Sequence, residues 1–281
     1  MSLSNNLKKI FSRLQKAEDL KLIQLDNTIN LLDKVLGREN YLLLNTYKSY
    51  PYATHDVDIV VKNFKKTTDA LQSAGLTLVK EFLPGIHYSK KGLLLVDIFE
   101  DVEWGSIKAV DNEIMWLGDR YVKIGDAEVR LPSFEGDILS IVAHTNFQFY
   151  KITLSDLIYI YKLMPDTNWP LVIQQASNHG WLDALLGTFS ILNYFHYTLY
   201  GEPSLIEKYI SSVRETSMEF PYIYSYSHVA KALKKQGFLN LVKLFSYTAD
   251  RLSLSSWAFY NAYCHVVMKK ISKIWVNYIH Y

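Results

Sequence analysis

Apolar residues in the first part of the chain recur with the three- and four-residue spacing of an amphipathic helix. This spacing relates Leu7, Ile10, Phe11, Leu14, Leu22, Leu25, Ile29, Leu32 and Leu36. Gly37 follows the last of them, and glycine is the residue that most readily ends a helix in the left-handed conformation. The pattern predicts an N-terminal helix over residues 6–36.

Shorter apolar runs, separated by turn residues, follow this helix and are typical of buried strands. We expect strands at 41–44, 57–61, 76–82, 87–89 and 93–99, and shorter strand-like pieces around Ile107, at 114–117 and at 129–131. A short helix is expected at 65–74, where Gly75 ends it. Lys90-Lys91-Gly92 has the composition of a hairpin turn between the last two long strands.

The pattern changes at Leu131-Pro132-Ser133, where Ser133 suits the N-cap of a helix over 134–149. Helical patterns then follow at 154–164, 168–178, 181–200, 203–215, 227–236, 238–253 and 255–280. We therefore predict an α+β protein with a mixed β-sheet and flanking helices, followed by an all-helical C-terminal domain. Its parts are an N-terminal helical segment at 1–37, an α/β domain at 38–131 and a helical domain at 132–281.

The composition excludes several classes of protein. With 49% hydrophobic and 14% aromatic residues, the chain has enough apolar surface to exclude a disordered chain. Cys264 is the single cysteine, which excludes an internal disulfide and a cysteine-based zinc finger. The N-terminus lacks a secretory signal, and the longest apolar run, 184–200, is interrupted by Asn193 and His196. We expect a cytoplasmic protein with no membrane partner.

The charge is divided unevenly along the chain. Residues 1–150 carry 18 Lys and Arg against 20 Asp and Glu, whereas residues 151–281 carry 12 against 8. Within 229–281 eight basic residues and one acid are interleaved with aromatic residues. This asymmetry suggests an anionic partner such as RNA. Aromatic residues at helical spacing, however, more often pack in a core.

Three carboxylates carry the main chemical pattern of the sequence. Asp56 and Asp58 lie two residues apart at the start of an apolar strand, so their side chains share one face. Asp97 lies within another apolar strand, where an acid is costly to bury without a partner. If the two strands are neighbours, the three acids converge and fit two Mg²⁺ ions, or Mn²⁺, for phosphoryl transfer. The alternative is a solvated strand end.

The segment from Asn40 to Asp97 resembles the nucleotidyltransferase fold of the DNA polymerase β-like superfamily. The shared pattern is an apolar strand, a turn, Asp-x-Asp opening the next strand, and a third acid on a later strand. The resemblance implies that Asp56 and Asp58 bind both metals, and that Asp97 binds the catalytic metal and helps to activate the acceptor hydroxyl. It also implies an enzyme that transfers a nucleoside monophosphate from an NTP such as ATP.

The resemblance continues through residues 131–137, His144 and residues 154–157 to the toxin-type members, including the type IV abortive-infection toxins. Some of those have a Lys/Arg-Asp element on these helices, for which Lys151 and Asp156 are the nearest counterparts. The resemblance makes both candidate nucleotide-binding residues, with Lys151 as a phosphate contact, whereas the alternative for Asp156 is an acid in the first turn of a helix, favourable with the helix dipole. The toxin-type resemblance implies RNA, such as a tRNA end, as the acceptor, and an antitoxin as a protein partner. It covers about residues 40–163, and the helices after 165 match no family.

One turn departs from the family pattern. The superfamily usually has Gly-Gly or Gly-Ser before Asp-x-Asp, where backbone N–H groups hold the nucleotide phosphates. This chain has Asn45-Thr46-Tyr47-Lys48 at that spacing. Asn45 and Thr46 can donate side-chain hydrogen bonds, and Lys48 is either a phosphate contact or a solvated turn lysine.

Two further choices stay open at this level. The acceptor is RNA, which the basic C-terminal region favours, or a small molecule, as in antibiotic-modifying relatives. The second choice is between an active enzyme and a catalytically silent member that uses the fold as a binding module. His55 precedes the first acid, where it orients that carboxylate, contacts substrate or is an ordinary surface histidine. His87 lies near the strand that leads to Asp97 and either faces the site or has a structural role, the latter being favoured.

Overall fold

The structure is a computed structural model that describes residues 5–48, 54–82, 85–104, 107–147 and 152–211. It combines helices with a five-stranded mixed sheet, so the predicted α+β class is confirmed. The chain divides into a first unit (residues 1–102, 110–141 and 154–172) and a second unit (residues 103–109, 142–153 and 173–281). Helix α5 (Leu154–Leu163) and the first part of α4 (Phe134–Phe147) belong to the first unit together with the sheet.

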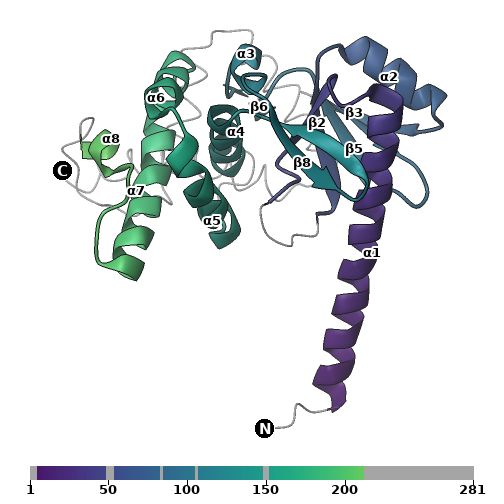
Figure 1. Cartoon of the computed structure of the whole chain (residues 1–281), viewed down its shortest axis with the longest axis horizontal. Helices are drawn as coiled ribbons and strands as arrows, with labels where there is room; N and C mark the ends of the chain where they lie inside the picture. The colour runs from purple at the N-terminus through teal and green to yellow at the C-terminus, as the bar shows by residue number, and fades with distance from the viewer. Residues whose placement is uncertain (1–4, 49–53, 83–84, 105–106, 148–151, 212–281) are drawn as a thin grey trace, which may run out of the picture. The chain divides into compact units, whose positions relative to one another are not determined.

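The predicted N-terminal helix is present as α1 (Asn5–Leu36), shown in purple in Figure 1. It ends where expected, at Gly37, whose φ of +75° is a left-handed conformation. Leu25, Ile29 and Leu32 are buried on its C-terminal half, because their spacing places them on one face against the sheet.

The central sheet has the strand order β1-β2-β5-β4-β3. Its strands are β1 (Tyr41–Leu44), β2 (Asp56–Val61), β3 (Thr77–Phe82), β4 (Gly85–Ser89) and β5 (Leu95–Phe99). Only β2 and β5 pair in parallel among these neighbours, and the other three pairings are antiparallel. Helix α2 (Phe64–Ser73) connects β2 to β3, with Asn63 as its N-cap. The strands predicted near these ranges are therefore confirmed.

Both faces of β2 and β5 bury apolar residues. Val57, Ile59 and Ile98 belong to the core cluster that also contains the buried face of α1. Val60 and Phe99 alternate with them and are buried as well. Because neighbouring residues on a strand face opposite sides, the even-numbered positions of β2 stand on the face away from α1.

The segment after the central sheet forms short strands and one short helix. These elements are β6 (Glu103–Trp104), β7 (Ile107–Lys108), α3 (Asn112–Met115), β8 (Arg120–Ile124) and β9 (Ala127–Leu131). The strand expected at 114–117 was wrong, since backbone N–H groups of Ile114 and Met115 donate to the carbonyl of Asp111 and close a helical turn. β8 was not predicted, because it is only half-buried before its last residue and pairs with β9 through a turn at Gly125.

The remaining described elements are helical. They are α4 (Phe134–Phe147), α5 (Leu154–Leu163), a 3-10 turn (Met164–Asp166), α6 (Trp169–Asn178), α7 (Leu182–Tyr200) and α8 (Glu207–Ser211). The Ser133 hydroxyl accepts a hydrogen bond from the Gly136 N–H at 2.9 Å, so the predicted N-cap of α4 is confirmed. The helices expected at 227–236, 238–253 and 255–280 lie outside the described residues.

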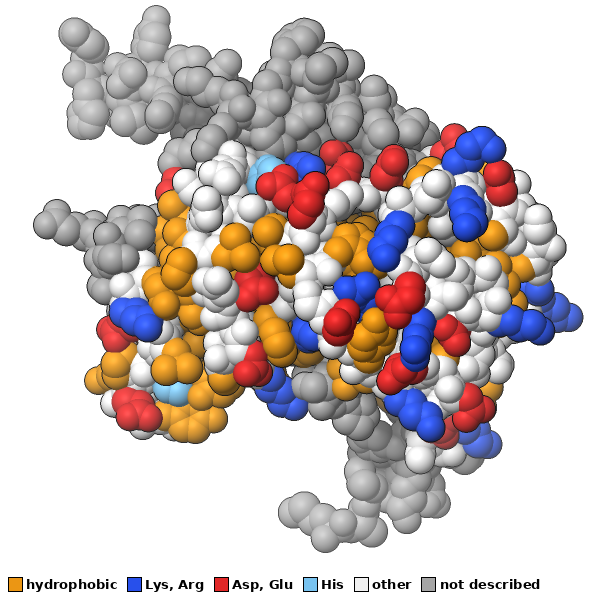
Figure 2. Space-filling model, turned by 45° about the horizontal axis from the view of Figure 1, so that its top comes forward, with side chains coloured by type: hydrophobic (Ala, Val, Ile, Leu, Met, Phe, Trp, Pro, Cys, Tyr) orange, Lys and Arg blue, Asp and Glu red, His pale blue; other side chains and the backbone are white. Residues whose placement is uncertain are grey.

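In the second unit, Trp181 is buried and donates a hydrogen bond to the Ala109 carbonyl at 3.1 Å. Its ring meets that of Phe147 edge-on. Hydrophobic side chains gather in the region of α7 on the face drawn in Figure 2. The exposed large hydrophobic residues of α7 are Tyr194, Phe195, Tyr197, Leu199 and Tyr200. No helix in the described ranges is long and apolar enough to span a membrane.

Candidate metal centre

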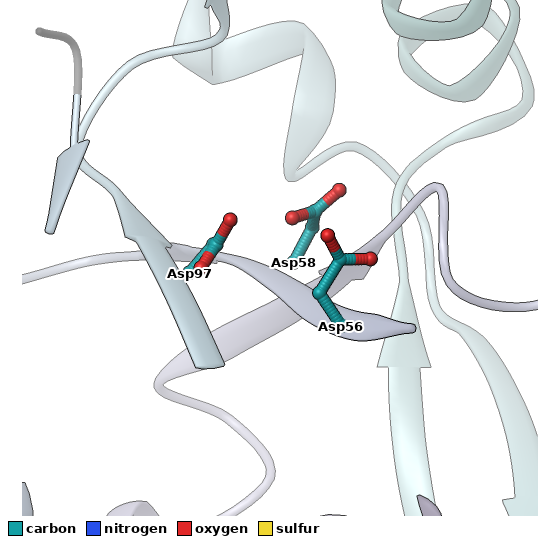
Figure 3. A group of neighbouring side chains, drawn as sticks. All are labelled: Asp56, Asp58 and Asp97. Atoms are coloured by element: carbon teal, nitrogen blue, oxygen red, sulfur yellow. The ribbon is translucent and has the colours of Figure 1, made fainter. Parts of the chain in front are cut away.

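The three carboxylates singled out from the sequence come together at the centre of the sheet (Figure 3). Asp56 and Asp58 stand on β2, and Asp97 stands on the neighbouring strand β5. In the parallel β2–β5 pair, Asp58 is the direct register partner of Asp97. Each residue offers one oxygen, and these three oxygens lie within 4.8 Å of one another. The predicted convergence of the acids is therefore present.

Strand alternation explains why the acids share a face. Val57 and Ile59 fill the core on the α1 side, so Asp56 and Asp58 must project on the opposite side. Asp97 lies on that face because Ile98, the next residue, points into the core. The trio, Asp56, Asp58 and Asp97, is thus fixed by the same packing that orders the two strands.

The electrostatics of the trio favour a cation. Burial raises the pKa of Asp58 well above its usual range, and the neighbouring carboxylates of Asp56 and Asp97 raise it further. Burial also raises the pKa of Asp97, and Asp56 adds to this effect, while a hydrogen bond from His87 opposes it. Like charges this close together are unstable unless a proton or a cation lies between them. A divalent cation with a preference for oxygen ligands matches this donor set.

Two of the acids are held by neighbouring side chains. The Thr54 hydroxyl lies 3.3 Å from Asp56 Oδ1. His87 Nδ1 hydrogen-bonds Asp97 Oδ1, and the two residues are register partners across the antiparallel β4–β5 pair. The contact between His87 and Asp97 arises because β4 pairs with β5, and this long-range pairing is not visible in the sequence.

The turn between β1 and β2 has the shape that a glycine would supply. Asn45 has a φ of +53°, and it is the only described residue other than glycine with a positive φ. Asparagine tolerates this left-handed conformation better than most residues. The Asn45 side-chain amide is enclosed and makes no hydrogen bond to a described residue.

Thr46 connects this turn directly to the acids. Its hydroxyl accepts a hydrogen bond from the Asp58 N–H at 3.0 Å and donates one to the Leu44 carbonyl at 3.0 Å. Thr46 is buried, so the bonds are shielded from water. The turn therefore fixes the backbone of a trio residue.

Lys48 is buried rather than solvated. Its Nζ lies 3.3 Å from Asp156 Oδ1 on α5 and 4.7 Å from the centre of the Tyr159 ring. Asp156 was grouped with Lys151 from the sequence, but the structure pairs it with Lys48, which is 108 residues away. Lys151 lies outside the described residues.

A buried acid that sequence reasoning missed lies beside this pair. Asp137 on α4 accepts hydrogen bonds from the Tyr159 hydroxyl at 2.7 Å and from Arg120 at 3.3 Å. Burial raises the pKa of Asp137, and the charge of Arg120 opposes this most strongly. Asp137 is one of two acids in the first turn of α4, where acids are common, so the sequence carries no distinct signal for its burial. His55 is exposed, and its Nε2 lies 3.5 Å from Lys21 Nζ.

Comparison of the chain with protein-family models, with curated proteins and with solved structures finds no match. Three oxygen donors on adjacent strands, with no sulfur or nitrogen donor among them, suit Mg²⁺ or Mn²⁺ better than Zn²⁺ or copper.

Proposed function

We propose that the protein is a metal-dependent nucleotidyltransferase, an enzyme that transfers a nucleoside monophosphate from an NTP to a hydroxyl acceptor. The observation that carries the proposal is the convergence of Asp56, Asp58 and Asp97 from two parallel, directly paired strands. An acidic trio alone is common in proteins. The turn after β1 strengthens the proposal, because it contains the left-handed Asn45 and the buried Thr46, whose hydroxyl is hydrogen-bonded to the N–H of Asp58 on the strand that carries two of the acids.

The residues have distinct roles in the proposed reaction. Asp56 and Asp58 would hold the metal ions, and Asp97 would complete the site and help to activate the acceptor hydroxyl. Bound divalent cations would neutralise the triphosphate and lower the pKa of that hydroxyl. The acceptor oxygen forms a bond to the α-phosphorus, the bond to the bridging oxygen of the leaving pyrophosphate breaks, and the acceptor proton is released.

The turn residues would bind the nucleotide phosphates. A left-handed residue at Asn45 lets the backbone curve as a glycine would, which favours close approach of N–H groups to an anion. The enclosed Asn45 amide is a further polar group next to this backbone. Lys48 is instead engaged with Asp156, so its proposed phosphate contact would require this ion pair to rearrange.

We propose RNA as the acceptor, with a small-molecule hydroxyl as the alternative. The support is the excess of basic residues in 229–281, which is a property of the sequence and lies outside the described residues. Binding to phosphates weakens steeply with salt. RNA affinity that falls as salt rises supports this choice, and a lack of RNA binding at low salt refutes it.

The test is magnesium-dependent transfer from each of the four α-labelled NTPs into total RNA. The Asp56→Ala/Asp58→Ala variant should lose all transfer, while Asp69→Ala, at an exposed acid of α2, should retain it. Transfer by the wild type that is lost in Asp56→Ala/Asp58→Ala and kept in Asp69→Ala supports the proposed nucleotidyltransferase activity. The labelled NTP that is incorporated identifies the nucleotide base that the enzyme prefers. Mg²⁺-dependent NTP binding without transfer to RNA indicates a small-molecule acceptor.

A second candidate function is a catalytically silent binding module. The buried Lys48–Asp156 pair favours it, because it keeps a basic side chain of the turn away from a substrate. This function requires that calorimetry detect no Mg²⁺-dependent NTP binding and that no label enter RNA. Either positive result excludes it.

A further inference from the structure

One acid of the trio differs from the other two in its hydrogen-bond partner. Asp97 is the trio member whose carboxylate is hydrogen-bonded to a ring nitrogen, through His87 Nδ1 and Asp97 Oδ1. The two side chains stand on adjacent strands at the same register level, so the backbone itself brings them together. By comparison, the pKa of Asp58 is raised by burial and by the charges of Asp56 and Asp97.

We propose that His87 is a positioning residue that makes Asp97 a one-oxygen ligand and thereby sets which divalent cation the trio prefers. This inference rests on the metal centre proposed above. An ionised carboxylate can only accept hydrogen bonds, so the His87 ring donates from Nδ1 to Oδ1. This bond uses one lone pair of Oδ1 and holds that oxygen toward the ring, so Asp97 presents chiefly Oδ2 to a cation.

A one-oxygen ligand discriminates between cations of different size. Mg²⁺ requires a near-octahedral shell of single oxygens, and Mn²⁺ accepts the same kind of site. Ca²⁺ is larger, takes six to eight oxygens and often binds both oxygens of one carboxylate. Holding Asp97 to one oxygen therefore favours the smaller ions. Releasing it permits two-oxygen binding and removes part of the penalty on Ca²⁺.

Several observations separate this role from simple packing. The His87 side chain is 25% exposed, so it is not a core residue whose volume the sheet requires. Its strand neighbour Tyr88 is buried and supplies the core contact at that end of β4. Partners that orient metal ligands typically change metal affinity by about 10–100-fold when they are removed. A packing role would instead affect all ions alike.

The experiment measures the affinities of the full-length protein for Mn²⁺ and for Ca²⁺, each added alone without nucleotide. Mn²⁺ binding is followed by electron paramagnetic resonance and Ca²⁺ binding by calorimetry. The variants are His87→Asn, whose amide nitrogen occupies the place of Nδ1, and His87→Gln, whose amide lies one methylene further away. His87→Leu removes the donor completely. His55→Leu changes the exposed histidine beside Asp56 and serves as the matched control.

We expect wild type, His87→Asn and His55→Leu to share one Mn²⁺-to-Ca²⁺ affinity ratio. His87→Gln and His87→Leu should lower this ratio by about tenfold, through weaker Mn²⁺ binding together with a smaller penalty on Ca²⁺. An unchanged ratio in His87→Gln overturns the inference even if His87→Leu does not fold. A wild-type protein that binds neither ion overturns the proposed metal centre itself, which is a different result.

Discussion

Asp58 and Asp97 are register partners in the one parallel pairing of the central sheet among the described strands. Their carboxyl groups therefore stand side by side on one face, with Asp56 two residues away on the same strand. Burial raises the pKa of both Asp58 and Asp97; the charges of Asp56 and Asp97 raise that of Asp58 further, and the charge of Asp56 adds to that of Asp97, where His87 opposes the rise. Protons and divalent cations should thus compete for the same oxygens.

The first prediction concerns the pH dependence of metal binding. A cation binds the ionised acids, and the raised pKa of Asp58 keeps this carboxyl protonated to higher pH than an ordinary aspartate. Mn²⁺ affinity should therefore increase as pH rises from 5 to 8, with release of protons on binding. Calorimetry in buffers of different ionisation enthalpy measures both the Mn²⁺ affinity and the number of protons released. Affinity that is constant across this range contradicts the raised pKa.

A second prediction follows for the metal-free protein. Between the ordinary pKa of aspartate and the raised pKa of Asp58, the folded state binds more protons than the unfolded state. The free energy of unfolding therefore falls as pH rises through this window. Asp58→Asn removes the titrating group. We therefore expect this variant to have a higher free energy of unfolding than the wild type at pH 8 in EDTA, and a smaller difference from the wild type at pH 5.

Denaturant unfolding with and without Mg²⁺ measures this effect. Mg²⁺ should stabilise the wild type and leave Asp58→Asn unchanged, because ligands that bind only the folded state raise its stability. Asp69→Asn, at an exposed acid of α2, is the control and should follow the wild type at each pH. A destabilised Asp58→Asn at pH 8 in EDTA is the result that rejects the repulsion argument.

The sequence was sufficient to predict the trio, but it did not identify the trio's surroundings. The i, i+2 spacing of Asp56 and Asp58 and the apolar residues around Asp97 are local patterns, and both were visible in the sequence. That β2 lies beside β5 was assumed. Strand adjacency depends on long-range packing, which periodicity does not encode.

The missed features are all non-local or conformational. His87 meets Asp97 because β4 pairs with β5, and Lys48 meets Asp156 across 108 residues. The φ of Asn45 is a backbone property that composition only suggests. The expected strand at 114–117 failed because four apolar or large residues in a row are compatible with either a strand or a buried helical turn.

A third prediction concerns Asn45. At a φ of +53°, a residue with a β-carbon is strained by about 1–2 kcal/mol, less for asparagine and not at all for glycine. Asn45→Ala should therefore lower the free energy of unfolding by about 1 kcal/mol, and Asn45→Gly should be neutral or stabilising. Chemical denaturation of both variants is the measurement. If Asn45→Ala is as stable as Asn45→Gly, the turn is not left-handed.

A fourth prediction concerns Thr46. Thr46→Val keeps the shape of the side chain but leaves the Asp58 N–H without its acceptor. An unpaired buried donor costs about 1–3 kcal/mol, so the variant should lose about that much stability. It should also bind Mn²⁺ more weakly, because the backbone of Asp58 is no longer fixed. Thr46→Ser retains the hydroxyl and should match the wild type in stability and Mn²⁺ affinity. If Thr46→Ser loses as much stability as Thr46→Val, the side-chain volume and not the hydrogen bond is the cause.

The fifth prediction tests the Lys48–Asp156 pair. Lys48 is nearly inaccessible, with 4% of its side chain exposed, whereas Asp156 retains 18%. Lys48→Met leaves Asp156 without its cation, and Asp156→Asn leaves a buried ammonium group above the Tyr159 ring. Each variant should lose about 2 kcal/mol of stability, less than the cost of breaking a fully buried pair because Asp156 is partly solvated.

The double variant Lys48→Met/Asp156→Asn separates an ion pair from two independent contacts. Residues in direct contact typically show coupling of about 0.5–3 kcal/mol, so the double variant should lose less than the sum of the single losses. Calorimetry with Mg²⁺ and NTP on the folded variants then tests the nucleotide role of Lys48. Because Nζ is engaged by Asp156, we expect NTP affinity to stay near that of the wild type. Weaker NTP binding by Lys48→Met, with tighter binding by Asp156→Asn, would instead show that the pair opens to give Lys48 to the phosphates.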